Sequence, residues 1–252
     1  MAINLQKGQT IDLRKNDKGE SFDLSQVTIG LGWDVKQKEN GFFGKLFGGA
    51  KEEEFDLDVI AFLLDSNGKV ANLGRDLIFS NGNKVGLHGG DVVFFNSMTY
   101  PSGTGTSSML FPEGTPKFTM QQKINQLLDK GELIVHTGDN LTGEGDGDDE
   151  QIIIKLDSLP VKIEKIIFLV CIYQGISKNQ QFGKVENAFI RACDKNNKEI
   201  AKYTLSNSPE LENKHSLIFG ETYRHSGGWK FRAIGEPLYT DNFVDILKKY
   251  VN

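Results

Sequence analysis

The sequence consists largely of short apolar segments separated by turn-forming residues. Its 252 residues include 28 glycines but only 6 prolines, together with many Val, Ile and Phe residues. This balance favours strands joined by tight turns over a helical bundle. About ten segments read as strands, which predicts an all-β sandwich or barrel. The predicted strands are 28–33, 55–64, 77–80, 92–96, 152–156, 166–173, 188–192, 200–205, 216–222 and 229–234.

Helical patterns are rare in the chain. We expect one helix over residues 119–130 and another over 242–250. Three stretches stand apart from the strand pattern: 38–54, 71–90 and 104–133. The third is rich in Gly, Ser, Thr and Pro before its helix, so we expect partial disorder there.

The first of these stretches contains an aromatic cluster, Phe42, Phe43, Leu46 and Phe47. One interpretation is a loop that packs its Phe side chains onto the body of the fold. The other is an exposed patch that contacts a partner or a membrane surface, since exposed apolar patches usually mark binding sites.

Composition argues against several classes of protein. A pI of about 5.5 without a Lys/Arg block argues against a nucleic-acid partner. The N-terminus lacks the pattern of a signal peptide, and no window reaches the length of a transmembrane helix, so we expect a cytoplasmic protein. Cys171 and Cys193 lie in apolar segments and are expected to be reduced, buried thiols.

Residues 138–150, which we call the acidic segment, contain six carboxylates, no basic residue and glycines set between the acids. Without these six charges the formal net charge of −5 would become +1. Such crowding destabilises a compact loop unless a cation neutralises it. Calcium binds six to eight oxygen atoms in a flexible shell, whereas zinc and copper prefer nitrogen and sulfur. The segment therefore predicts a calcium site.

Two familiar loop motifs do not fit the acidic segment. In an EF-hand register starting at Asp139, the third, fifth and sixth positions hold Leu141, Gly143 and Glu144 in place of the required Asp/Asn and Gly, and a strand follows. A phosphate loop does not fit either, because acidic residues between the glycines would repel phosphate unless a metal bridges it.

A second pair of carboxylates lies far away in the sequence. Asp56 and Asp58 begin a strand-like segment and, two residues apart, project from the same face of a strand. They suit chelation, although two solvated residues on an edge strand are the simpler interpretation. Asp34 follows another predicted strand and is expected to approach the same point.

Seven segments form a recognisable set: 30–34 (GLGWD), 55–58 (FDLD), 135–150, 182–185 (FGKV), 188–191 (AFIR), 219–225 (FGETYRH) and 228–235 (GWKFRAIG). Together they resemble the TerD family of tellurite-resistance and stress proteins. The resemblance covers nearly the whole chain, 1–252, as a single domain with insertions at about 38–54, 71–90 and 104–133. It implies a β-sandwich of two antiparallel sheets, with short helices in the insertions and at the C-terminus.

The resemblance also implies a function. It points to a non-catalytic stress-response module that binds Ca²⁺, as two ions, and contacts a protein partner or a membrane-associated stress complex as a peripheral protein. Some relatives resemble cAMP-binding proteins. The implied metal ligands are Asp56, Asp58, Asp139, Asn140, Asp146, Asp148, Asp149 and Glu150.

Two alternatives remain open at this stage. A metal-dependent phosphoester hydrolase could use His136 beside the acidic segment, but only four histidines exist and none forms an HExxH motif. His136 is better explained as a packed or hydrogen-bonded strand residue. A nucleotide or phosphate site could use Arg224, Lys230 and Arg232 around a glycine turn, although a hairpin with solvated bases explains the same residues.

Overall fold

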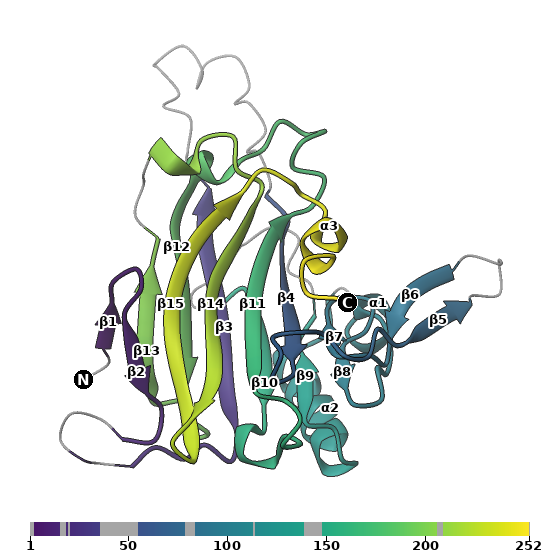
Figure 1. Ribbon diagram of the computed structural model, residues 1–252. Coiled ribbons are helices and arrows are strands. Elements are labelled where there is room, and N and C mark those ends of the chain that lie inside the picture. The colour runs from purple at the N-terminus through teal and green to yellow at the C-terminus, as the bar shows by residue number, and fades with distance from the viewer. Residues whose placement is uncertain are drawn as a thin grey trace.

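The computed structural model describes most of the chain, and its elements form two large sheets that pack face to face (Figure 1). The residues described are 3–15, 19, 21–35, 55–78, 84–112, 114–138, 148–205 and 209–251.

The first sheet has seven strands in the order β1-β13-β12-β3-β10-β9-β8. Its pairs are antiparallel except β1 with β13, which is parallel. The strands are β1 (Ile3–Leu5), β13 (Glu199–Thr204), β12 (Val185–Cys193), β3 (Val27–Val35), β10 (Glu150–Ile154), β9 (Ile134–His136) and β8 (Thr99–Tyr100).

The second sheet has six strands in the order β2-β15-β14-β11-β4-β7, all antiparallel. A separate hairpin of β5 (Arg75–Ile78) and β6 (Lys84–His88) projects from the body (Figure 1). The strands of the second sheet are β2 (Thr10–Asp12), β15 (Gly228–Leu238), β14 (Ser216–His225), β11 (Lys165–Ile172), β4 (Leu57–Leu64) and β7 (Val92–Val93).

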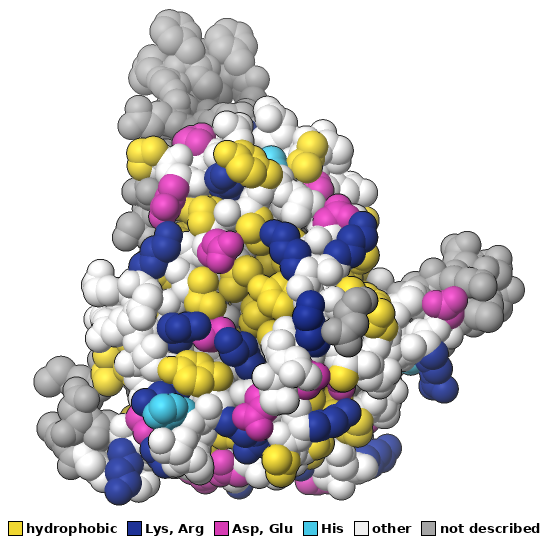
Figure 2. Space-filling view, in the orientation of Figure 1, with side chains coloured by type: hydrophobic (Ala, Val, Ile, Leu, Met, Phe, Trp, Pro, Cys, Tyr) yellow, Lys and Arg dark blue, Asp and Glu magenta, His cyan; other side chains and the backbone are white. Residues whose placement is uncertain are grey.

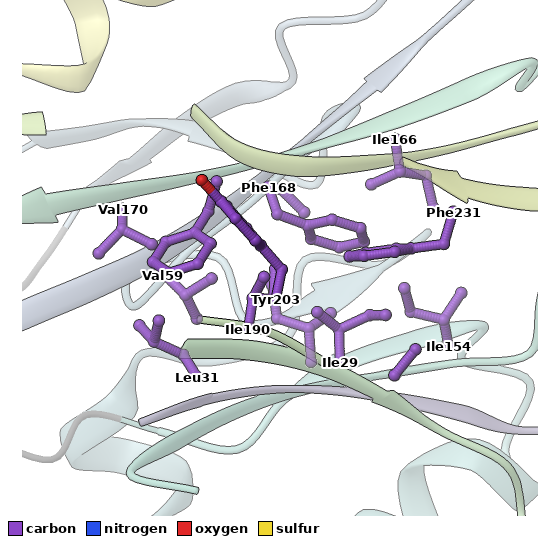
Figure 3. Close-up of a cluster of buried hydrophobic side chains, with 14 of the residues drawn as sticks. Ile29, Leu31, Val59, Ile154, Ile166, Phe168, Val170, Ile190, Tyr203 and Phe231 are labelled. Atoms are coloured by element: carbon purple, nitrogen blue, oxygen red, sulfur yellow. The ribbon is translucent and has the colours of Figure 1, made fainter. Parts of the chain in front are cut away.

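The helices are short and lie outside the sandwich. α2 (Lys117–Asp129) packs on the outer face of the first sheet, and α3 (Phe243–Leu247) packs on the outer face of the second. Between the sheets the facing side chains form one core (Figure 3). The remaining helical elements are α1 (Ser107–Leu110) and the 3-10 turns η1 (Leu156–Ser158), η2 (Phe182–Lys184) and η3 (Pro209–Leu211).

Strand β4 shows why the sandwich forms. Leu57 and Val59 face the core between the sheets, while Ile60 and Phe62 face the cluster beneath α3. Because successive residues of a strand point to opposite faces, a continuously apolar segment such as 59–64 suits a strand that is covered on both sides.

The predicted fold class, a β-sandwich of two antiparallel sheets, is confirmed, and each of the ten predicted strands overlaps an observed strand. Five short strands were missed: β1, β2, β6, β8 and β9. The predicted helix 119–130 is α2, whereas the predicted helix 242–250 is shorter and ends at Leu247.

The segment expected to be partly disordered instead contains α1, with Thr106 and Phe111 buried beside it. Packing of these side chains against the body outweighs the weak local propensity of a Gly- and Ser-rich stretch.

Candidate functional site

The acidic segment leads into β10 in the first sheet. Of its predicted ligands, Asp139, Asn140 and Asp146 lie outside the described residues, while Asp148, Asp149 and Glu150 are described. These three consecutive acids have different surroundings.

Asp148 is paired with a base. Its Oδ1 lies 2.6 Å from Nε of Arg191 on β12, and its Oδ2 accepts a hydrogen bond of 3.0 Å from Gln151. Arg191 also contacts Glu199 at 3.2 Å, and these carboxylates raise its pKa. The Asp148 carboxylate lies over Gly30, where a β-carbon would overlap it. Gly30 therefore provides the space for this ion pair.

Asp149 is half-buried and crowded by other acids. Its Oδ2 accepts a hydrogen bond of 2.9 Å from the backbone N–H of Trp33, and its own N–H donates to the Leu31 carbonyl at 2.7 Å. Burial raises its pKa to about 6, and the charges of Asp34 and Asp148 act in the same direction. A cation at this point would stabilise the ionised carboxylate.

Glu150 and His136 together complete the edge of β4. Strand β7 pairs with β4 only at Ala61 and Phe62. At Val59, the backbone N–H donates to Glu150 Oε2 at 2.7 Å, and the carbonyl lies 3.0 Å from His136 Nε2. Two side chains from the first sheet thus take the place of a neighbouring strand.

The hydrogen bonds of His136 define its tautomer. Its Nδ1 accepts from the Gly138 N–H at 3.1 Å, so the proton is on Nε2, which donates to the Val59 carbonyl. The side chain is fully buried, and burial lowers its pKa to about 4. The interpretation of His136 as a hydrogen-bonded strand residue is confirmed, and a neutral imidazole with both nitrogens engaged is not placed to act as a general base.

Asp56 and Asp58 lie at the start of β4. The register pairs Asp58 with Cys171, so the side chain of Asp58 lies on the face of β4 opposite to Val59. Asp58 and Asp241 add to the effect of burial, which raises the pKa of the Cys171 thiol to about 12. Glu150, in contrast, reaches the edge of β4 from the first sheet.

The fit of a metal ion depends on both the chemistry and the arrangement of the donors. Asp34, Asp56 and Asp149 offer only oxygen donors, which suit calcium. In the part of the chain that the structure describes, no group of three or more His, Cys, Asp or Glu side chains is arranged to hold a metal. A complete calcium shell would thus need donors from residues 139–147.

The basic hairpin β14–β15 uses its cations internally. Arg224 donates to the carbonyls of Leu159 and Ile163, both at 2.9 Å, and lies over the Trp229 ring at 4.5 Å. Arg232 forms an ion pair with the buried Glu221.

Lys230, the third predicted anion ligand, pairs with Asp12 in the register of β15 and β2. These contacts leave the nucleotide site as a prediction without added support.

Three further predictions concerned the cysteines, the aromatic cluster and membrane-spanning helices. Cys171 and Cys193 are free and buried, as expected. The aromatic cluster from Phe42 to Phe47 lies outside the described residues. None of the described helices is long and apolar enough to cross a membrane.

Sequence analysis did not assign roles to Gly30 or Arg191. One signal was present: Gly30 and Gly32 alternate with apolar residues along β3, so one face of this strand has no side chains at two positions. Such a bare face marks a place where another group approaches closely.

Comparison with known proteins gives consistent results. The TerD domain model matches residues 1–90 and 123–250. Tellurium resistance protein TerX of Serratia marcescens is 47% identical over 251 residues and covers 100% of both chains. Stress response protein SCP2 of Bacillus subtilis (strain 168) is 37% identical over 252 residues, again covering 100% of both.

Two further comparisons extend this result. General stress protein 16U of Bacillus subtilis (strain 168) is 34% identical over 236 residues, or 93% of this chain and 90% of that protein. The crystal structure of the unknown function protein SAV2460 is similar in fold, with a TM-score of 0.51, 16% identity, and coverage of 90% of this chain and 98% of that one. With a family model that matches most of its length and full-length relatives well above 30% identity, the chain belongs to the TerD domain family.

Proposed function

We propose that this chain is a calcium-binding, non-catalytic interaction module of a stress response, in which Ca²⁺ orders the acidic segment. The names of its relatives, tellurium resistance and stress response proteins, support the stress-response role. The calcium role rests on the chain's own residues.

One observation carries the calcium proposal. Asp34, Asp148 and Asp149 gather where the acidic segment enters β10, and the charges of Asp34 and Asp148 add to the effect of burial, which raises the pKa of the Asp149 carboxyl to about 6. The preceding residues of the segment add Asp139, Glu144 and Asp146. So many carboxylates within thirteen residues of sequence, three of them at the start of β10, favour a divalent cation with oxygen ligands.

We narrow the proposed ligand set by the contacts of the described acids. The contacts of Asp148 with Arg191 and of Glu150 with Val59 give these two acids structural roles. We therefore assign the described part of the shell chiefly to Asp149 and Asp34. Asp139, Asn140 and Asp146 would complete it, and the number of ions stays a prediction.

The non-catalytic part of the proposal is supported by His136. The hydrolase alternative relied on His136 beside the acidic segment, and both nitrogens of its imidazole are already bonded. The nucleotide alternative draws on Arg224 and Arg232, which are bonded to carbonyls and to Glu221. Neither alternative is favoured.

Calorimetry tests the calcium proposal. We expect saturable binding of Ca²⁺ to the metal-free protein, with Mg²⁺ weaker because it demands a more regular shell. Asp149→Asn removes one charged ligand and should weaken calcium binding about tenfold or more, since affinity follows the ligand charge count. Asp157→Asn, at an exposed position in η1, is the matched control and should bind as the wild type does.

Two results would reject the proposal. One is the absence of saturable calcium heat in the wild-type protein. The other is an Asp149→Asn isotherm that matches those of the wild type and the control.

A further inference from the structure

Exposed apolar side chains gather at one end of the six-stranded sheet. Eight large apolar side chains are exposed among the described residues, and four of them follow β11 or β15. They are Tyr173 (44% exposed), Ile176 (56%), Tyr239 (71%) and Val244 (39%), which we call the tyrosine surface.

Hydrogen bonds of the backbone N–H and carbonyl groups hold the segments of this surface together. The Ile176 N–H donates to Asp241 Oδ2 at 3.0 Å, which joins the segment after β11 to the segment after β15. Between them, the His215 carbonyl accepts from Ile172 and its N–H donates to Leu238, both at 2.9 Å. The segments that follow β11 and β15 thus adjoin at the upper end of these strands, and the segment after β15 leads into α3 (Figure 1).

Lysines accompany both tyrosines. Lys178 Nζ lies 5.0 Å from the centre of the Tyr173 ring, and Lys214 Nζ lies 3.1 Å from that of Tyr239. Hydrophobic side chains lie beside basic and acidic ones at this end of the molecule (Figure 2). Tyrosine with its apolar ring and polar hydroxyl, next to lysine, is a combination suited to the boundary between lipid and water.

We propose that the tyrosine surface docks on an anionic phospholipid bilayer and that calcium bound at the acidic segment assists this docking. The lysines would contact the anionic headgroups, and the apolar side chains would enter the interfacial region. A bilayer is favoured over a peptide because Tyr173, Ile176 and Tyr239 project singly from the segments after β11 and β15, Val244 projects from α3, and a lysine lies beside each tyrosine ring.

The calcium link is a structural one. The Tyr173 N–H donates to the Asp56 carbonyl at 2.8 Å, and three residues later the Val59 N–H donates to Glu150 Oε2 at 2.7 Å, so the start of β4 connects this surface to the end of the acidic segment. Carboxylates near a negative surface repel it, and a bound cation removes that repulsion. This step rests on the proposed calcium-binding function.

Vesicle sedimentation tests the proposal. The full chain is mixed with vesicles of phosphatidylcholine alone or with added phosphatidylserine, in calcium or in EGTA. We expect binding that needs phosphatidylserine and is stronger in calcium. Ile176→Ser with Tyr239→Ser should lower the partition coefficient at least tenfold, because both side chains lose apolar area that the bilayer would bury.

A matched variant controls for exposed apolar area in general. Met109→Ser with Phe118→Ser changes two side chains that are 62% and 74% exposed elsewhere on the molecule, and should leave vesicle binding unchanged. Lys178→Gln and Lys214→Gln should each reduce binding to phosphatidylserine vesicles about fivefold. Thermal melts check that every variant is folded.

The outcomes separate this inference from the proposed function. Equal vesicle binding by the wild type and the Ile176→Ser, Tyr239→Ser variant would overturn the docking surface, as would no binding by a wild type that binds calcium in calorimetry. Binding that is equal in calcium and EGTA would overturn the calcium link. Wild-type self-association that this variant abolishes, without vesicle binding, would assign the surface to a second copy of the chain. A wild type without calcium heat would instead reject the proposed function.

Discussion

The edge of β4 and the adjoining acidic segment hold their carboxylates in opposite ways. At the edge, Glu150 accepts the Val59 N–H and His136 is neutral, with a partner for each nitrogen. One residue earlier in the chain, Asp149 is half-buried and has the charges of Asp34 and Asp148 nearby. A carboxylate with matched hydrogen bonds supports the fold, whereas one that is crowded by like charges is the better candidate for a ligand site.

The largest expected effect concerns pH at the edge of β4. His136 has a pKa of about 4 in the folded protein and about 6.5 when unfolded. Only the unfolded state takes up this proton between those values, so the contribution of His136 to stability is complete above pH 6.5 and is lost as the pH falls to 4. The loss should reach about 3 kcal/mol, measured by urea unfolding in EGTA across this range.

The variant His136→Gln isolates this contribution from other groups that titrate in acid. Its free energy of unfolding should be lower than that of the wild type at pH 7, and the difference should shrink towards pH 4. A constant difference across the range would contradict the buried, neutral state of His136.

A second prediction concerns Asp148, an acid of the same segment whose carboxylate, like that of Glu150, has specific partners. In Gly30→Ala the new methyl group would displace the Asp148 carboxylate from Arg191 and Gln151. We expect a loss of about 2 kcal/mol in the free energy of unfolding, because a nearly buried carboxylate would lose its partners. The control Gly86→Ala, in β6, has room for a methyl group and should change stability by less than about 0.5 kcal/mol.

The local sequence pattern predicted where most strands lie but not which strands pair with one another. The apolar segments predicted ten strands because alternation and length are local properties. The missed two- and three-residue strands β2, β8 and β9 depend instead on distant neighbours. The N-terminal β1 pairs in parallel with β13, about two hundred residues away, and no local signal indicates this partner.

The candidate site shows the same limit. Composition located the acidic segment but did not separate the roles of its acids, because those roles depend on partners far along the chain. Asp148 meets an arginine 43 residues away, and His136 meets a carbonyl 77 residues away. Only the packing of the two sheets brings these groups together.

The smallest expected effect is also the most direct test of the comparison. The Asp149 carboxyl has a pKa of about 6, against 3.8 for an ordinary Asp, so its ionisation costs the folded protein stability as the pH rises from 3.8 to 6. In EGTA at pH 7, Asp149→Asn should therefore raise the free energy of unfolding by about 1 kcal/mol, a modest gain because solvent screens this half-buried group. In calcium that saturates both proteins the sign should reverse, since a tenfold or greater loss of affinity costs the variant about 1.4 kcal/mol or more of binding energy relative to the wild type. Thermal melts of both proteins in EGTA and in calcium measure the two signs. If Asp149→Asn destabilised the protein equally in both conditions, Asp149 would be a structural acid like Glu150, and the contrast between the two regions would fail.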